Sequence, residues 1–155
     1  MPWKDWHREV PRVRVTGGGF DLKRRRSGQK HVLFRLTQPL SVQLSDTGEE
    51  LLLPVGTLSD GSSVPGVLWG ALAANPADLL LPGFAHDFAY RRGARLRNPA
   101  GGSRAIDRYQ ADLLHIALDR VMKVKKADQG KIFYALRVGG GFAFRERSVG
   151  WDGRD

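Results

Sequence analysis

The chain contains no cysteine and no long run of apolar residues. The lack of cysteine excludes disulfide bonds, thiolate nucleophiles and cysteine-ligated zinc sites, so a metal ion would need His, Asp, Glu or backbone oxygen ligands. A membrane helix needs about 18 consecutive apolar residues, and we therefore expect no transmembrane segment. The first residues, MPWKDWHREV, lack the basic start and apolar centre of a secretory signal. We expect a protein that is made in the cytoplasm.

Acidic residues are few relative to basic ones. Lys and Arg total 25 against 16 Asp and Glu, a formal net charge of +9, which favours anionic partners such as nucleic acid, anionic lipid or an acidic protein surface. The turn pair Ser27–Gly28 predicts a solvated hairpin loop in the most basic run. No aromatic residues alternate with these charges and no helix-turn-helix pattern is present, so we expect no sequence-specific nucleic-acid recognition. The basic patch consists of Lys23, Arg24, Arg25, Arg26 and Lys30.

The length of 155 residues and the composition, 41% hydrophobic and 26% charged, predict one globular domain. No linker divides the chain. The expected parts are an N-terminal arm (1–11), a β part (12–56), a helical part that contains the motifs (57–140) and a C-terminal tail (141–155).

The chain predicts an α+β fold, with a small N-terminal antiparallel sheet followed by a bundle of about four helices. Short β-branched or apolar runs separated by turn residues predict strands at 12–15, 31–36, 40–44 and 51–55. Helical periodicity predicts helices at 65–75, 81–92, 104–122 and 127–138. Ser103 is the expected N-cap of the third helix, and the triplet Gly139-Gly140-Gly141 is the expected end of the fourth.

The predicted third helix carries a polar stripe. A rotation of about 100° per residue aligns the side chains of Arg108, Asp112, His115 and Asp119. The stripe is either the wet side of an amphipathic helix or part of a site. In the second case Asp112 faces His86, because a loop of about eleven residues allows the two helices to be antiparallel neighbours.

A histidine paired with a carboxylate in this way has a chemical use. The carboxylate fixes the tautomer of the imidazole and makes it a better base, and a second carboxylate beside the histidine, here Asp87, can hold a cation. Within Leu58–Gly66, LSDGSSVPG, Asp60 can cap the following helix or offer a carboxylate to a metal ion, and Ser63 is a plausible helix cap. A catalytic serine is not expected there, because the closing glycine of a nucleophile elbow is absent.

Four motifs in order over roughly Phe34 to Gly140 resemble the domain-of-unknown-function family 1353 of tailed phages and prophages. That family has a T-D-[FG]-[AG]-S-[IV]-P loop followed by a Trp-containing helix, then H-D-x-x-Y, R-x-x-A-D and Y-x-x-[VL]-R-x-x-G. The corresponding stretches here are 58–65 with Trp69, 86–90, 108–112 and 134–140.

The H-D-x-x-Y motif is itself similar to that of phospholipases of the A-two class. The resemblance implies that His86 is the general base, Asp87 a calcium ligand, Asp112 the carboxylate that orients the histidine, and Tyr90 a supporting hydrogen-bond donor. The chain departs from that class in lacking cysteines, and residues 60–66 match its calcium loop only in place and glycine content. His115 stands where the phage family usually has a large apolar residue, so it either adds a second imidazole to the site or marks a more exposed helix.

Three functions remain open. The first is a phage or prophage hydrolase with a metal ion on Asp87 and Asp60. The most specific version of this hypothesis is a phospholipase-like enzyme, which the net positive charge would draw to anionic membrane surfaces. The second is a non-catalytic virion, tail or assembly protein that leaves the host cytoplasm in the phage particle. The third, a zinc site on His86 with an aspartate, ranks last because the close ligand spacing of such sites is missing.

Overall fold

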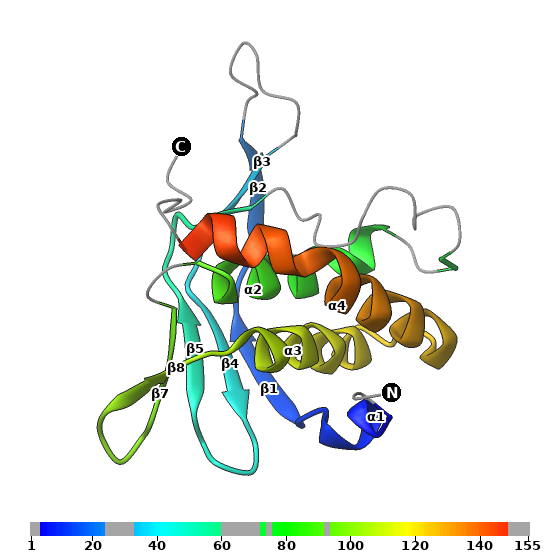
Figure 1. Ribbon diagram of the computed structural model, residues 1–155. Coiled ribbons are helices and arrows are strands. Elements are labelled where there is room, and N and C mark those ends of the chain that lie inside the picture. The colour runs from blue at the N-terminus through cyan, green and yellow to red at the C-terminus, as the bar shows by residue number, and fades with distance from the viewer. Residues whose placement is uncertain (1–3, 24–32, 60–71, 74–75, 92–93, 149–155) are drawn as a thin grey trace.

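The computed structural model describes residues 4–23, 33–59, 72–73, 76–91 and 94–148, and its fold is α+β, as the sequence predicts (Figure 1). The strands are β1 (Val13–Gly17), β2 (Phe20–Lys23), β3 (Leu33–Leu36), β4 (Leu40–Leu44), β5 (Glu50–Leu53), β6 (Leu58–Ser59), β7 (Arg95–Arg97) and β8 (Ser103–Ala105). The helices are α1 (Trp6–Glu9), the 3-10 turn η2 (Pro76–Leu79), α2 (Leu80–Ala89), α3 (Arg108–Val121) and α4 (Lys126–Ser148).

The main sheet is antiparallel and has the strand order β1-β4-β5-β7-β8. Alternation along β4 and β5 buries Leu40 and Val42 on one strand and Leu51 and Leu53 on the other. These four side chains form the core together with apolar residues of α2 and α3. The strands expected at 12–15, 40–44 and 51–55 are present as β1, β4 and β5. The helices α2 and α3 pack on the apolar face of this sheet.

A second antiparallel sheet has the order β2-β3-β6. Its strand β3 overlaps the strand expected at 31–36, and β2 pairs with β3 as consecutive strands, which agrees with a hairpin around Ser27–Gly28. The loop itself, with Arg24, Arg25, Arg26 and Lys30 of the basic patch, lies outside the described residues, as does the side chain of Lys23.

Helix α3 contacts both α2 and α4 and lies beside the strands (Figure 1). One side of α3 packs into the core shared with the sheet and α2 through Ala111, Leu114 and Leu118. Its other apolar residues join a second cluster with α1 and α4, in which the Trp6 ring stacks on Phe133 at 4.4 Å between ring centroids. A residue on α3 can therefore contact both neighbouring helices.

The expected start of the third helix is wrong. Residues 103–105 form strand β8, paired with β7, and α3 begins at Arg108. Its N-cap is Asp107, whose side chain accepts a hydrogen bond from the backbone N–H of Gln110 while the Gln110 side chain bonds back to the cap. This reciprocal capping box satisfies two backbone donors at the helix start, which Ser103 would not do from its place in the sheet.

The expected end of the fourth helix is also wrong, because α4 continues through the glycine triplet to Ser148. Glycine costs a helix only about 1 kcal/mol per residue relative to alanine, and tertiary context routinely overrides a cost of that size. The helix expected at 81–92 is present as α2 after the turn η2. Most of the helix expected at 65–75 lies outside the described residues.

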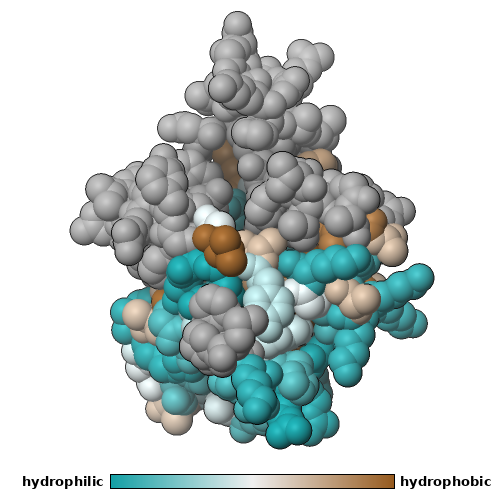
Figure 2. Space-filling view, turned by 45° about the vertical axis from the view of Figure 1, so that its right-hand side comes forward, coloured by the Kyte–Doolittle hydropathy of each residue, from teal (hydrophilic) through white to brown (hydrophobic). Residues whose placement is uncertain are grey.

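The described surface is predominantly polar on the face shown in Figure 2, where hydrophobic residues appear only in small separate patches. Among the helices that the structure describes, none combines the length and the apolar character needed to cross a bilayer.

Candidate active site

The predicted contact between the second and third helices is present. His86 on α2 and Asp112 on α3 are joined by a 2.7 Å contact between the His86 Nε2 and the Asp112 Oδ1. Both side chains are buried, with 3% of His86 and none of Asp112 exposed. The contact forms because α2 and α3 pack closely through small and apolar residues such as Ala85 and Ala111, which hold the two polar groups at hydrogen-bond distance.

Asp112 is the hub of a network that joins three helices. Its Oδ1 also accepts a hydrogen bond from the hydroxyl of Tyr90, one helical turn after His86. Its Oδ2 accepts a hydrogen bond of 2.9 Å from Nη1 of Arg137 on α4. Arg137 was not among the predicted site residues, although it is the arginine of the Y-x-x-[VL]-R motif, and that motif was the available signal.

The charges of the centre follow from this arrangement. Burial raises the pKa of the Asp112 carboxyl, but the hydrogen bond and charge of His86, with the bonds from Tyr90 and Arg137, outweigh burial and lower that pKa below its usual value. Burial, together with the negative charge of Asp112, raises the pKa of Tyr90 well above its usual value. At neutral pH Asp112 is therefore an anion that only accepts hydrogen bonds, and Tyr90 keeps its proton.

This protonation pattern sets the tautomer of His86. Because Asp112 only accepts, the His86 Nε2 must carry the hydrogen of their bond, and in the neutral ring the lone pair lies on Nδ1. A carboxylate on the far nitrogen orients an imidazole and makes the other nitrogen a better base. The pair thus has the geometry of a general base with its orienting carboxylate.

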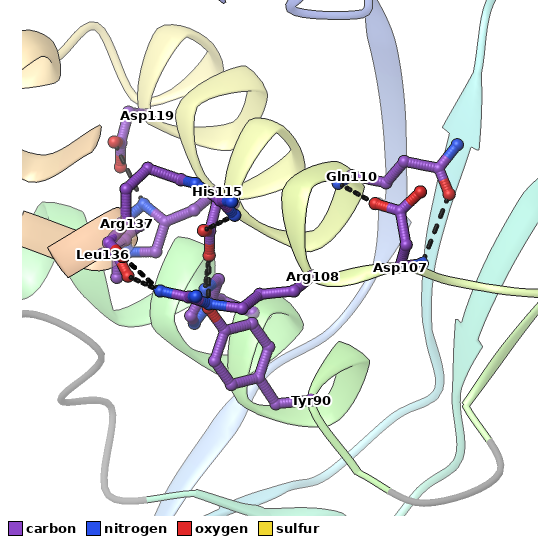
Figure 3. A network of polar contacts seen from close by, with 10 residues as sticks. Tyr90, Asp107, Arg108, Gln110, His115, Asp119, Leu136 and Arg137 are labelled. Carbon is purple, nitrogen blue, oxygen red and sulfur yellow. Dashed lines mark hydrogen bonds and ion pairs between the residues drawn. The ribbon is translucent and has the colours of Figure 1, made fainter. Parts of the chain in front are cut away.

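Arg108, predicted as a supporting residue, holds α4 in place. Its Nη2 donates a hydrogen bond of 3.0 Å to the backbone carbonyl of Leu136 and another to that of Arg137. Figure 3 shows its guanidinium group beside Tyr90. The positive charge of Arg108 lowers the pKa of Tyr90, but burial and the negative charge of Asp112 raise that pKa by more. Arg108 therefore fixes the stretch of α4 from which Arg137 reaches Asp112.

Asp87 forms an ion pair within α2 and its C-terminal end, with its Oδ2 3.8 Å from the Arg91 Nη2. Arg91 also donates a hydrogen bond to the backbone carbonyl of Leu58 at the start of β6. Calcium needs six to eight oxygen ligands, and the described residues contain no group of three or more His, Asp or Glu that could hold a metal ion. Asp60, the other predicted ligand, and Ser63 lie outside the described residues. Calcium and zinc stay predictions.

His115 and Asp119 form a second imidazole–carboxylate pair on α3. The His115 Nδ1 lies 3.1 Å from the Asp119 Oδ2, and the His115 ring meets the His86 ring at 5.3 Å between centroids and 74° between planes. His115 is 1% exposed and Asp119 is fully buried. The interpretation of the stripe as the wet side of a helix is therefore wrong, as is that of a more exposed helix, because Asp112, His115 and Asp119 are all buried. His115 is the second imidazole.

A separate cavity of about 340 Å³ borders α3 away from His86 and Asp112. Polar groups on its rim bind one another, as in the 3.0 Å bond from the Arg104 Nη1 to the Gln110 Oε1. Its lining residues include Leu44, Leu96, Tyr109, Gln110, Leu113 and Leu114. Neither histidine–carboxylate pair of α2 and α3 is among the residues that line this cavity.

Comparison of the chain with protein-family models, with curated proteins and with solved structures gave no match.

Proposed function

We propose that the chain is a phage or prophage hydrolase of the phospholipase-like type, with His86 as its general base. The observation that carries the proposal is the buried 2.7 Å contact between the His86 Nε2 and the Asp112 Oδ1, on an oxygen that also accepts from Tyr90. The proposal gives these three residues the roles that the resemblance to phospholipases of the A-two class implies. Four motifs in family order support the phage origin.

In the proposed reaction His86 removes a proton from water through Nδ1, and the water oxygen attacks the carbonyl carbon of an ester. The tetrahedral intermediate collapses when the bond to the alcohol oxygen breaks, and His86 returns its proton to that oxygen. Asp112 remains ionised throughout and stabilises the imidazolium, while Tyr90 and Arg137 hold the carboxylate in position. A base placed in this way contributes about 100- to 10,000-fold to the rate.

The proposed substrate class follows from charge as well as from the resemblance. A formal charge of +9 favours association with anionic surfaces, and an anionic phospholipid bilayer presents both the charge and the ester. The resemblance adds a calcium ion on Asp87 and Asp60, which the assay tests directly by including a chelator.

The test is release of fatty acid from phosphatidylglycerol vesicles by the purified protein, with calcium and with chelator. We expect His86→Ala to lower the rate about 100- to 10,000-fold. The matched control is His7→Ala, because His7 is an exposed histidine on α1. Circular dichroism shows whether each variant is folded. Unchanged turnover in folded His86→Ala, or no release by the folded unmodified protein, would refute the proposal.

A second candidate is a non-catalytic virion, tail or assembly protein that docks on an acidic partner. It is favoured by the burial of the centre, since His86, Tyr90 and Asp112 are at most 3% exposed and, together with Arg137, link three helices. Such a network can specify how helices dock without doing chemistry. Mass spectrometry of purified phage particles tests this role, which predicts the protein among the structural components.

A further inference from the structure

The turn that joins α3 to α4 presents positive charge to solvent and no exposed acid. The one acidic residue between positions 120 and 130 is Asp128, which is 2% exposed and accepts a hydrogen bond from the backbone N–H of Ala73. In the part of the chain that the structure describes, no carboxylate forms an ion pair with the exposed basic residues of this stretch. These residues, which form the cationic turn, are Arg120, Lys123, Lys125 and Lys126.

Helix α1 lies against the cationic turn and forms a hollow with it (Figure 1). The Arg120 Nη2 donates a hydrogen bond of 3.2 Å to the backbone carbonyl of His7, and its Nε donates one of 3.0 Å to the Gln129 Oε1. Both acceptors are uncharged, so these bonds hold the guanidinium group in place without neutralising it. The hollow has a volume of about 160 Å³ and is lined by Trp6, His7, Arg120, Lys126 and Gln129.

The side chains around the hollow match an anion with several oxygens. Arg and Lys bind phosphate oxygens through charge-assisted hydrogen bonds, which are about twice as strong as bonds between neutral groups. Arg120 uses two of its five N–H donors within the described residues, and the others remain for a ligand. The exposed acids nearest to His7 along the chain, Asp5 and Glu9, do not line the hollow. The wall therefore favours a phosphate group.

Two features of this surface favour a bilayer of anionic phospholipid over nucleic acid. Val121, at the end of α3, is 44% exposed next to Arg120, and apolar residues combined with Lys and Arg are typical of surfaces that enter a membrane interface. Proteins that bind single-stranded nucleic acid stack bases on aromatic rings. Residues 120–130 contain no Phe, Tyr or Trp, and the ring of Trp6 is stacked on Phe133 in the core.

We propose that the cationic turn docks the protein on an anionic phospholipid bilayer, with a lipid phosphate in the hollow between α1 and α4. The choice of a bilayer rests on the proposed function, and the inference deepens it by naming the surface that meets the substrate. Arg120 follows Asp112 by eight residues on α3, which is about 12 Å along the helix axis. The docking surface thus lies near the proposed base without including it, and the two can be altered separately.

The experiment measures binding of the protein to sedimented vesicles of phosphatidylglycerol and of phosphatidylcholine, with binding expected only to the first. Each Lys or Arg near an anionic surface contributes about fivefold to the affinity. A triple variant should therefore bind phosphatidylglycerol vesicles about 100-fold more weakly than the unmodified protein. Its substitutions are Lys123→Gln, Lys125→Gln and Lys126→Gln.

The matched control removes the same number of positive charges from the strands and their flanks. Its substitutions, all at exposed positions, are Arg12→Gln, Arg14→Gln and Arg35→Gln. We expect its affinity to fall by less than about tenfold, since these residues are not part of the docking surface. Circular dichroism shows whether both triple variants are folded. An equal loss in the two variants would overturn the inference, because it would show an effect of net charge alone.

Two further measurements separate this inference from its alternatives. An affinity for single-stranded DNA that the lysine variant loses, at unchanged affinity for vesicles, would assign the cationic turn to nucleic acid and overturn the inference. Fatty-acid release is followed on the same vesicles. Binding without release by the unmodified protein would overturn the proposed function and leave the docking surface standing. Equal binding and equal release by the lysine variant and the unmodified protein would overturn the docking surface alone.

Discussion

Replacement of Asp112 by asparagine tests whether this residue holds the three helices together. The side chain is fully buried and accepts hydrogen bonds from His86, Tyr90 and Arg137. Asparagine keeps the shape but removes the charge, and its amide N–H groups face hydrogen-bond donors, whereas both carboxylate oxygens accept from them. Breaking a buried ion pair by removing one partner costs about 3–5 kcal/mol, and we expect a loss of this size in the free energy of unfolding.

Urea unfolding followed by circular dichroism measures this loss. The matched control is Asp46→Asn, a change of the same chemistry at an exposed position, which should stay within about 0.5 kcal/mol of the unmodified protein. A loss of less than about 1 kcal/mol for Asp112→Asn, at an unchanged dependence on urea concentration, would refute the assignment of Asp112 as the hub.

The same comparison made as a function of pH separates charge from shape. The folded protein lowers the pKa of Asp112 below its usual value of 3.8. The ionised carboxylate therefore adds stability that is complete above the pKa of the unfolded chain and is lost as the pH falls through the lower pKa of the folded state. The gap between the unmodified protein and Asp112→Asn should be full at neutral pH and should shrink below about pH 4. A gap that stays constant into strong acid would contradict this account.

Three further substitutions test other parts of the structure by the same unfolding assay. Asp107→Ala removes the cap of α3 and should cost about 1 kcal/mol; no measurable cost would contradict the capping box. Gly17→Ala should cost at least about 1–3 kcal/mol, because Gly17 has a φ of 76° and an added Cβ would overlap the carbonyl oxygen of Pro39. Tyr90→Phe should cost about 1–2 kcal/mol through the lost bond to Asp112, and a stabilised variant would show that the hydroxyl is not held there.

Local patterns predicted the elements whose periodicity is strong, and missed those set by pairing partners. The run Leu40–Leu44 alternates cleanly and is strand β4 with the same bounds. Strands β7 and β8 have three residues each and are stabilised by pairing in the sheet, so their sequences alone look like a loop, although Arg95–Arg97 does alternate polar and apolar residues. Ser103 and Asp107 are both good cap residues, and only the sheet pairing of Ser103 decides between them.

The candidate site was predictable to the extent that helix geometry determines it. The spacing of His86 and Tyr90 on one helix and the position of Asp112 on the next were enough to predict their meeting. Whether the polar stripe of α3 faces water or another helix depends on the packing of α4, which a helical wheel does not contain. For the same reason the bond from Arg137 to Asp112 could not be derived from spacing alone.

The two imidazole–carboxylate pairs differ in what they can do for the fold. His86 and Asp112 lie on different helices, so their bond helps to determine how α2 and α3 dock, and a structural role alone could account for it. His115 and Asp119 lie one turn apart on the same helix, so their bond cannot determine how two helices dock. Replacing a buried polar pair by apolar residues is often neutral or stabilising, and among the described residues this pair leaves two buried acceptors without a partner. We therefore expect the fold to depend less on the bond between His115 and Asp119 than on the bond between His86 and Asp112.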